Sequence, residues 1–484
     1  MIDLRSVFYL TGIVLCCLAI AMSVPLLVEA LVYKTLEWKA FGVSMVICGF
    51  FGSSLALSNP PHGKTVLGMR EAFLVTSVIW IILSIFAGLP FYYSEFHFTF
   101  INACFEAVSA LTTTGSTIMD GIDDAPKGIL LWRALLQCIG GTGIILMAMT
   151  IFPILRIGGM QLFRSEFSDR SEKILPRVSQ IAAAILGTYL FFIFACMILL
   201  YWAGMPFFDA TCSAMATVST GGLTTKDCSI GFYNDPLIES IIAVFMIIGG
   251  STLILFVLLW KGERKAIFED SQLRAYLMLL VIASLIVTLW QWGMNQQSFL
   301  HSLRLSTFSV ISVVTTTGLV TSDYGSWGNF PIIIFFLLSF IGGCTGSTTG
   351  GIKIFRFQVL FALTRTHLMQ LRKPHGMYVP TYQGQKISSS AALSVFTFLT
   401  LYFLCMAALA CALSIAGLDF IASLSGAAAS LGNVGPGLGP LIGPHTSFAQ
   451  LPDAAKILMM AGMILGRLEL LTVLVLFMPS FWQD

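Results

Sequence analysis

Ten apolar segments, each long enough to cross a lipid bilayer as a helix, occupy most of this 484-residue chain. A helix needs about 20 apolar residues to span the hydrocarbon core. The ten segments lie at 7–32, 39–58, 71–93, 129–155, 179–203, 237–260, 275–293, 330–363, 389–416 and 455–480. Charged residues make up only 10% of the chain, against about a quarter in ordinary globular domains, so they cannot cover a water-facing surface. The sequence therefore predicts an all-α polytopic membrane protein.

The charge and the reactive side chains exclude several functions. A formal net charge of +2 provides no concentration of cations for a nucleic-acid partner. The 11 cysteines contain no C-x-x-C spacing and the six histidines no H-x-x-x-H pair, so we expect neither a disulfide framework nor a protein metal centre. No paired carboxylates or nucleophile with a base occur in the apolar segments, which argues against an integral-membrane enzyme. The first segment is longer than the apolar part of a signal sequence, so we predict a retained span.

Four shorter apolar segments lie between the spans, at 99–114, 207–220, 300–317 and 419–434. They are too short to cross the bilayer and are predicted to be re-entrant helices. With the N-terminus in the cytoplasm, 18 of the 26 Lys and Arg residues fall on the cytoplasmic side, including Lys353 and Arg356. Five fall outside, and Arg133, Lys456 and Arg467 lie within or at the edges of spans. This positive-inside bias predicts that both termini are cytoplasmic and that all four short segments enter from the outside.

The short segments belong to a fourfold repeat. They end in Ala-Leu-Thr-Thr-Thr-Gly (110–115), Thr-Val-Ser-Thr-Gly-Gly (217–222), Val-Val-Thr-Thr-Thr-Gly (313–318) and Leu-Gly-Asn-Val-Gly-Pro (431–436). Taking Gly115, Gly221, Gly318 and Gly435 as equivalent gives spacings of 106, 97 and 117 residues. Each unit thus contains a span, a short helix, a glycine turn and a second span. The predicted divisions are two extra N-terminal helices (1–66) and four units at 67–175, 176–272, 273–386 and 387–484.

Short helices that end in Thr-Thr-Gly at membrane depth have a specific use. The negative end of a helix dipole favours a nearby cation, and carbonyl oxygens of the following turn can replace an ion's hydration shell. Glycine permits the positive φ angles that such a turn requires. Irregular backbone survives in a membrane only where it lines a cavity or is buried in protein. Four such turns around one axis therefore predict a cation pore.

These repeats resemble the TrkH/KtrB/HKT superfamily of potassium transporters, most closely its bacterial TrkH branch, and the resemblance covers the whole chain. It implies that K⁺ is the transported ion and that the glycine turns form the selectivity filter. Carried over by position, the implied filter residues are Thr113, Thr114, Gly115, Ser219, Thr220, Gly221, Thr316, Thr317, Gly318, Asn433, Val434 and Gly435. Glycine at all four places goes with potassium preference in this family. No Gly-Tyr-Gly follows, so we expect a shorter and less selective filter than that of a potassium channel.

The second span of the third unit is interrupted by a glycine-rich stretch at 342–353. Each glycine weakens a helix by about 1 kcal/mol relative to alanine, and the stretch lacks the G-x-x-x-x-G-K-[ST] pattern of a phosphate-binding loop. We predict a broken helix that acts as a movable gate below the filter, as the resemblance also implies. The predicted gate residues are Gly343, Cys344, Thr345, Gly346, Ser347, Thr348, Thr349, Gly350, Gly351 and Lys353.

Arg467 is a charge within the last predicted span. A charged side chain there costs about 3 kcal/mol, so it should face the pore or a partner. We predict that it hydrogen-bonds carbonyls of the 343–351 loop and forms an electrostatic barrier. An ion pair with Glu469 is the alternative, although residues two apart on a helix point to different faces.

Acidic residues outnumber basic ones on the predicted outer face, where they would concentrate cations. They are Glu95, Asp120, Asp123, Asp124, Asp209, Asp227, Asp235, Asp323, Asp419 and Asp453. The function open beside a gated pore is an alternating-access symporter coupled to H⁺ or Na⁺, although Asp and Glu are nearly absent from the span centres.

The partners follow from the resemblance alone. It implies a homodimer in the bacterial inner membrane, in contact with lipid, and a separate cytosolic TrkA-type ring that carries nucleotide-binding domains. This ring would dock on the basic loops 156–178, 261–274 and 365–387. No covalently bound cofactor is expected, and nucleotide would act only through the regulatory subunit.

Overall fold

The computed structural model describes residues 4–60, 68–150, 178–295 and 298–483. Seven helices in these ranges are long and apolar enough to span a membrane, or nine if two bent helix pairs each count as one span. The regular structure described is helical apart from a hairpin of two-residue strands, β1 (Thr381–Tyr382) and β2 (Gln385–Lys386). The predicted all-α polytopic membrane fold is confirmed.

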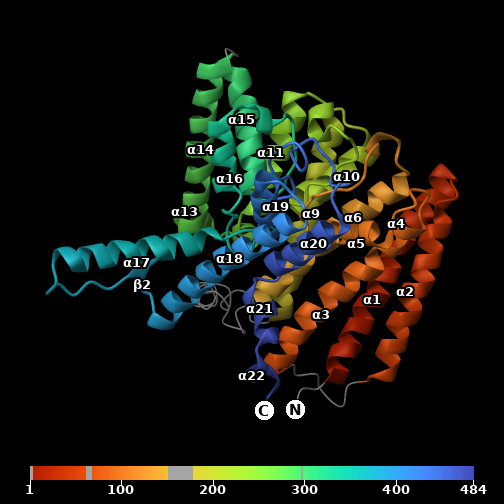
Figure 1. Cartoon of the computed structure of the whole chain (residues 1–484), viewed down its shortest axis with the longest axis horizontal. Coiled ribbons are helices and arrows are strands. Elements are labelled where there is room, and N and C mark those ends of the chain that lie inside the picture. The colour runs from red at the N-terminus through yellow and green to blue at the C-terminus, as the bar shows by residue number, and fades with distance from the viewer. Residues whose placement is uncertain (1–3, 61–67, 151–177, 296–297, 484) are drawn as a thin grey trace.

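Two helices precede the repeats and lie together at the right of Figure 1. They are α1 (Leu4–Leu27), extended by the π-helical turn η1 (Val28–Tyr33), and α2 (Trp38–Ser58). Their backbones approach closely at Gly12, where a Cβ atom would lie 2.6 Å from the Ala56 nitrogen and from the Gly52 carbonyl oxygen. Small residues permit such close helix packing in membranes.

The first two units have the predicted order of a long helix, a short helix and a second long helix. Unit 1 consists of α3 (Met69–Ala87), α4 (Leu89–Tyr93), α5 (Phe100–Leu111), η2 (Ile122–Asp124) and α6 (Lys127–Thr150). Unit 2 consists of α9 (Val178–Trp202), α10 (Phe207–Val218), η4 (Ser229–Phe232), α11 (Pro236–Gly250), α12 (Leu253–Trp260) and α13 (Lys265–Glu269).

The last two units have the same order, with more breaks. Unit 3 consists of α14 (Ser271–Asn295), α15 (Phe299–Val314), η5 (Tyr324–Ser326), α16 (Asn329–Leu338), α17 (Ile354–Arg372), β1 and β2. Unit 4 consists of α18 (Ser389–Ile415), α19 (Phe420–Gly432), α20 (Asp453–Arg467), α21 (Leu471–Leu474), η6 (Val475–Phe477) and α22 (Pro479–Trp482). The four predicted short segments are the helices α5, α10, α15 and α19, of 12 to 16 residues each.

Packing between the units closes them into a ring. Helix α6 packs against both α5 and α10, α11 packs against α10 and α15, α17 packs against α18, and α20 packs against α19 and α5. The contact between α20 and α5 joins the last unit to the first. Val7 of α1 and Phe481 of α22 belong to one buried cluster, so the two ends of the described chain lie side by side (Figure 1).

Within the described residues, three of the predicted spans bend sharply or are interrupted by a loop. The span 237–260 bends by 94° between α11 and α12, and the span 455–480 bends by 105° after α20. The span 330–363 is interrupted between α16 and α17. Glycines lie at each break, and Glu469 and Leu470 adopt positive φ angles of 61° and 24° at the second bend, so an apolar composition does not guarantee a straight helix.

Two predicted cytoplasmic segments also differ. Residues 365–372 continue α17, which extends away from the other helices at the left of Figure 1, and β1 and β2 follow it. The predicted loop 156–178, apart from its last residue, lies outside the described residues, as do the predicted unit boundaries at 66/67 and 175/176.

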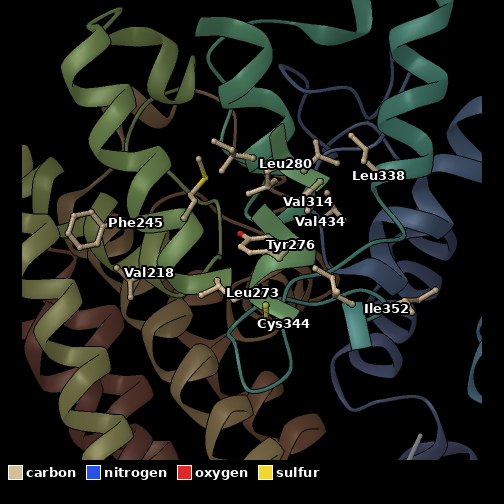
Figure 2. Packing of buried hydrophobic residues seen from close by; sticks show 14 of the residues in the cluster. Val218, Phe245, Leu273, Tyr276, Leu280, Val314, Leu338, Cys344, Ile352 and Val434 are labelled. Carbon is tan, nitrogen blue, oxygen red and sulfur yellow. The ribbon is translucent and has the colours of Figure 1, made fainter. Parts of the chain in front are cut away.

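The largest buried cluster among the described residues joins units 2, 3 and 4 and the end of α6 of unit 1 around the interrupted span. Figure 2 shows Val218, Val314 and Val434 from the ends of three short-helix segments, with Cys344 and Ile352 from the 339–353 segment nearby. The core of the bundle therefore lies where the glycine turns meet this segment.

Candidate functional site

The four glycine turns share one backbone conformation. Each contains a left-handed residue with a φ of 52°, followed two positions later by a glycine with a positive φ between 76° and 97°. The left-handed residues are Thr113, Thr220, Thr316 and Asn433, and the glycines are Gly115, Gly222, Gly318 and Gly435. The left-handed backbone conformation costs a residue other than glycine about 1–2 kcal/mol. Because this costly conformation recurs at the same place in all four units, the four turns are structurally equivalent.

The turns form a closed ring in which each glycine faces a carbonyl of the next unit. A Cβ on Gly115 would lie 2.5 Å from the Gly221 oxygen, and one on Gly435 would lie 2.6 Å from the Thr114 oxygen. A Cβ on Gly222 would overlap the Thr317 oxygen, and one on Gly318 would overlap the Val434 oxygen. The carbonyls of Thr114, Gly221, Thr317 and Val434 are therefore equivalent, and we call these four residues and the four glycines the glycine ring.

This geometry corrects the predicted alignment of unit 2 by one residue. The predicted triplet was Ser219, Thr220 and Gly221, whereas the triplet equivalent to Thr113–Gly115 is Thr220, Gly221 and Gly222. Ser219 is the C-cap of its short helix, as Thr112 is in unit 1. Gly222 was missed because two glycines are adjacent and the unit spacing varies. In the other three units the predicted residues occupy the ring positions.

A cavity of about 120 Å³ opens on one side of the glycine ring, and we call it the vestibule. Gly115, Gly222 and Gly318 contribute to its lining. Of the ten predicted outer acidic residues, Asp120 and Asp227 line it. The Asp227 carboxylate accepts a hydrogen bond from the Ile122 nitrogen at 2.9 Å, which joins units 1 and 2 beside the cavity.

An arginine in the vestibule wall is neutralised by a buried carboxylate. Arg133, predicted to lie within a span, forms an ion pair with Glu106 of α5 at 2.8 Å. Glu106 also accepts from the Ile118 nitrogen at 3.0 Å, and Arg133 donates to the Thr224 carbonyl at 3.2 Å. The sequence analysis missed this pair, although a carboxylate and a cation in neighbouring apolar segments are a signal for it.

The 339–353 segment closes the side of the ring opposite the vestibule. The Thr348 hydroxyl donates to the Val218 carbonyl at 3.2 Å and accepts from the Thr220 hydroxyl at 3.1 Å. The Gly350 nitrogen donates to the Thr316 hydroxyl at 2.8 Å, and a Cβ on Gly350 would overlap the Gly432 carbonyl oxygen. The segment therefore contacts units 2, 3 and 4 beneath the ring.

Further hydrogen bonds pair the two ends of the 339–353 segment and join it to unit 2. The Gly342 nitrogen donates to the Ile352 carbonyl at 3.0 Å, so the two ends of the segment are paired. The Cys344 nitrogen donates to the Gly250 carbonyl at 2.9 Å, and the Thr252 hydroxyl donates to the Thr345 carbonyl at 2.8 Å. The bend between α11 and α12 thus holds the 339–353 segment by hydrogen bonds. The predicted gate residues therefore lie together below the glycine ring.

Arg467 contacts this loop as predicted. Its Nη1 donates to the Thr348 carbonyl at 2.8 Å, which confirms the predicted hydrogen bond. The alternative ion pair with Glu469 is not formed, because Glu469 pairs with Arg356 at 2.5 Å. A cavity of about 20 Å³ lies here between α6 and the loop, and Lys353, Arg467 and Glu469 line it.

Lys353 and Arg356 correct the predicted distribution of charge. Both were assigned to the cytoplasm, and both are buried. The Lys353 ammonium donates to the Thr349 carbonyl and, at 2.9 Å, to the Thr349 hydroxyl. The helix that would have carried them out of the bilayer is broken by the loop, so they remain inside the bundle.

Comparison with known proteins agrees with this architecture. Residues 39–484 match the model of the TrkH family, described as cation transport proteins. The chain is 42% identical over 468 residues to the Trk system potassium uptake protein TrkI of Halomonas elongata, covering 96% of this chain and 94% of the relative. It is 35% identical over 485 residues to TrkH of Salmonella typhimurium, with 99% of both chains covered.

The fold also matches a solved structure over its full length. The crystal structure of the potassium transporter TrkH from Vibrio parahaemolyticus superimposes with a TM-score of 0.92 at 31% identity, covering 100% of both chains. From the fourfold architecture, the family match and these relatives we conclude that the chain belongs to the TrkH family of cation transport proteins.

Proposed function

We propose that this protein takes up potassium across the bacterial inner membrane through a gated, channel-like pore. The glycine ring is the observation that carries the proposal. Four short helices direct the negative ends of their dipoles toward one place, and the carbonyls of Thr114, Gly221, Thr317 and Val434 form one ring there. Such carbonyls can replace the water that a potassium ion sheds. The relatives are named as potassium uptake proteins, which supports this choice of ion.

The 343–351 loop and Arg467 form the gate in this proposal. The loop fills the space beneath three of the four ring units, so an ion leaving the ring meets it directly. The buried Arg467 guanidinium faces the small cavity beside the loop and repels a cation there. Opening requires the loop to leave its hydrogen bonds to Thr220 and Thr316.

A symporter coupled to H⁺ or Na⁺ is the alternative. It needs a carboxylate that can bind the coupling ion near the middle of the membrane. Three of the seven buried carboxylates among the described residues, those of Glu106, Glu239 and Glu469, form ion pairs with arginines. The other four, Glu29, Glu37, Asp209 and Asp270, lie at the ends of helices. This pairing favours the channel.

Ion-selective flux in reconstituted vesicles tests the proposal. Gly115→Ser should lower the preference for K⁺ over Na⁺, because its Cβ would meet the Gly221 carbonyl. Gly121→Ser is the matched control, since Gly121 also has a positive φ but nothing within 4 Å of its Cβ position. Equal K⁺/Na⁺ selectivity in the two variants would show that the glycine ring does not recognise the ion. A K⁺ flux that requires a proton or sodium gradient would favour the symporter.

The proposal includes the orientation and the partners. Both termini would be cytoplasmic, the vestibule would face outward, and two copies would assemble with a TrkA-type nucleotide-binding ring. The clustering of Val7 with Phe481 supports placing the termini on one side. Reporter fusions at each end, and co-purification with the regulatory subunit with and without nucleotide, test these points.

A further inference from the structure

Two side-chain hydrogen bonds cross the glycine ring, and both lie between unit 4 and unit 1. The Ser116 hydroxyl donates to the Gly435 carbonyl at 2.9 Å, and the Asn433 amide donates to the Thr114 hydroxyl at 2.9 Å. Each bond joins residues 319 positions apart. In the described structure, no side-chain hydrogen bond links the turns 113–116, 220–223, 316–319 and 433–436 to one another at the other three junctions. We call the bonded junction the 4–1 seam.

The Asn433 bond continues into a relay within unit 1. The Thr114 hydroxyl lies 2.7 Å from the Thr112 hydroxyl, which donates to the Val108 carbonyl at 2.7 Å. Because Thr112 gives its only hydroxyl proton to the Val108 carbonyl, the Thr114 hydroxyl donates to Thr112 and accepts from Asn433. The second Asn433 amide proton goes to the Met463 carbonyl of α20 at 2.9 Å. Asn433 therefore connects the unit 4 span to the inner end of the unit 1 turn.

Unit 3 contains the same relay without the seam. The Thr317 hydroxyl lies 2.7 Å from the Thr315 hydroxyl, which donates to the Ile311 carbonyl at 2.7 Å. No neighbouring turn in the described structure donates to Thr317. Thr114 and Thr317 are thus equivalent ring residues that differ in one hydrogen bond.

Ser116, at the outer end of the seam, is hydrogen-bonded both within its own unit and to unit 4. The Ser116 carbonyl accepts from the Ser109 hydroxyl at 2.5 Å, while its own hydroxyl reaches Gly435. In unit 3 the Leu319 carbonyl accepts from Ser312 at 2.7 Å, but leucine has no hydroxyl to offer to the next turn. The bond across the ring is therefore specific to Ser116.

The amino-acid composition of the unit 4 turn explains why it is held by hydrogen bonds to another unit. Val434 occupies the place of Thr114 and Thr317 and has no hydroxyl for an internal relay. In unit 2, where Gly221 takes that place, the Thr220 hydroxyl instead reaches the loop residue Thr348 at 3.1 Å. The unit 4 turn depends on Asn433 and on the Ser116 hydroxyl.

We propose that the 4–1 seam determines ion specificity, with Ser116 and Asn433 acting as positioning residues for the ring carbonyls. The inference rests on the proposed function. A ring of carbonyls discriminates between alkali cations only while its oxygens keep their spacing and number. The seam bonds the Thr114 hydroxyl and the Gly435 carbonyl, so it fixes the residue that carries the Thr114 ring carbonyl and the residue that follows the Val434 ring carbonyl. It does so at the one junction where the chain does not continue to the next unit. Without it, the ring relaxes and accepts Na⁺ more readily.

Vesicle flux of K⁺ and Na⁺ in Thr114→Val and Thr317→Val tests the inference. Both variants keep the side-chain shape and lose the Thr–Thr bond, but only Thr114→Val also loses the seam bond. We expect the K⁺/Na⁺ ratio to fall about fivefold further in Thr114→Val, which corresponds to one hydrogen bond of about 1 kcal/mol. Thr114→Ser keeps the hydroxyl and should restore the ratio. Equal ratios in the two valine variants would overturn the inference.

A second pair of variants covers failure of Thr114→Val to insert. Asn433→Gly keeps the left-handed backbone and removes both donors, and Ser116→Ala removes the outer bond. Each should lower the K⁺/Na⁺ ratio, and the double variant of Asn433→Gly with Thr114→Val should lower it by less than the two single effects combined, because the two share one bond. Unchanged ratios would overturn the inference. If Gly115→Ser alters selectivity and the seam variants do not, only the seam fails; if Gly115→Ser is also without effect, the proposed function fails.

Discussion

Arg356 and Glu469 form a buried ion pair at 2.5 Å across 113 positions of the chain. Arg356 lies in the first turn of α17, directly after the 339–353 segment, and Glu469 lies at the bend after α20. The guanidinium also lies over the Phe398 ring of α18, 3.6 Å from its centroid. The pair therefore ties the exit of the loop to the last unit, and it leaves Arg467 to hold the loop itself.

Breaking this pair should destabilise the protein strongly. Glu469→Gln removes the carboxylate charge from the ion pair with Arg356, whose side chain is fully buried, and breaking a buried ion pair costs about 3–5 kcal/mol. We expect a clear fall in the thermal unfolding midpoint in detergent. Asp123→Asn is the control, because its pair with Lys226 is 3.4 Å long and the Asp123 side chain is 42% exposed; exposed pairs contribute about 0–1 kcal/mol. Similar shifts for both variants would contradict the prediction.

The corrected alignment of unit 2 predicts different effects for two adjacent glycines. Gly222→Ala places a Cβ on the Thr317 carbonyl at a φ of 79°, whereas Gly221 has no positive φ and a Cβ there would meet the Gln137 side chain rather than backbone. We expect uptake by Gly222→Ala to fall at least about tenfold below that of Gly221→Ala, since strain of 1–2 kcal/mol accompanies the left-handed angle alone. Rubidium uptake in potassium-uptake-deficient cells measures this. The opposite ranking would restore the alignment predicted from the sequence.

The spans and short helices were predictable because length and hydropathy determine them. The segments 99–114 and 300–317 are apolar but too short to cross a membrane, and both are short helices in the structure. The bend after α20 was not predictable, because residues 455–480 are apolar on both sides of it and the positive φ of Glu469 leaves no mark in hydropathy.

The candidate site likewise contains features that the sequence predicted and features that it did not. The hydrogen bond from Arg467 to the loop followed from the cost of burying a charge, which requires a partner. The partner of Glu469 did not follow, since Arg356 is far away in sequence and was assigned to a cytoplasmic loop. The sequence analysis missed Gly222 because residue types alone do not show which of the adjacent glycines Gly221 and Gly222 is equivalent to Gly115. The positive φ of Gly222 in the structure identifies it.

The close contact of the two leading helices gives a stability prediction. Gly12→Ala brings a Cβ within 2.6 Å of backbone atoms of α2, which cannot rotate away, so α1 and α2 must separate. Gly49→Ala is the control on the same pair of helices, where the added Cβ makes an ordinary contact of 3.8 Å with Ala19. We expect Gly12→Ala to lower the thermal unfolding midpoint in detergent. Gly49→Ala should leave it unchanged or raise it, because alanine favours a helix by about 1 kcal/mol over glycine. Equal midpoints would show that the packing at Gly12 adapts.

Removing the charge of Arg467 should raise potassium flux in vesicles that contain this protein alone. Like charges 4 Å apart repel by about 4 kcal/mol at an effective dielectric constant of 20, so in the proposed gate the buried guanidinium would oppose a cation that leaves the glycine ring. Arg467→Ala should therefore increase flux at least about tenfold. Two further variants separate the charge from the hydrogen bond to the Thr348 carbonyl. Arg467→Lys keeps a positive donor and should keep flux low, whereas Arg467→Gln keeps a donor without charge and should conduct like Arg467→Ala. Low flux in Arg467→Gln would assign the effect to the hydrogen bond that holds the loop, and unchanged flux in Arg467→Ala would remove Arg467 from the gate.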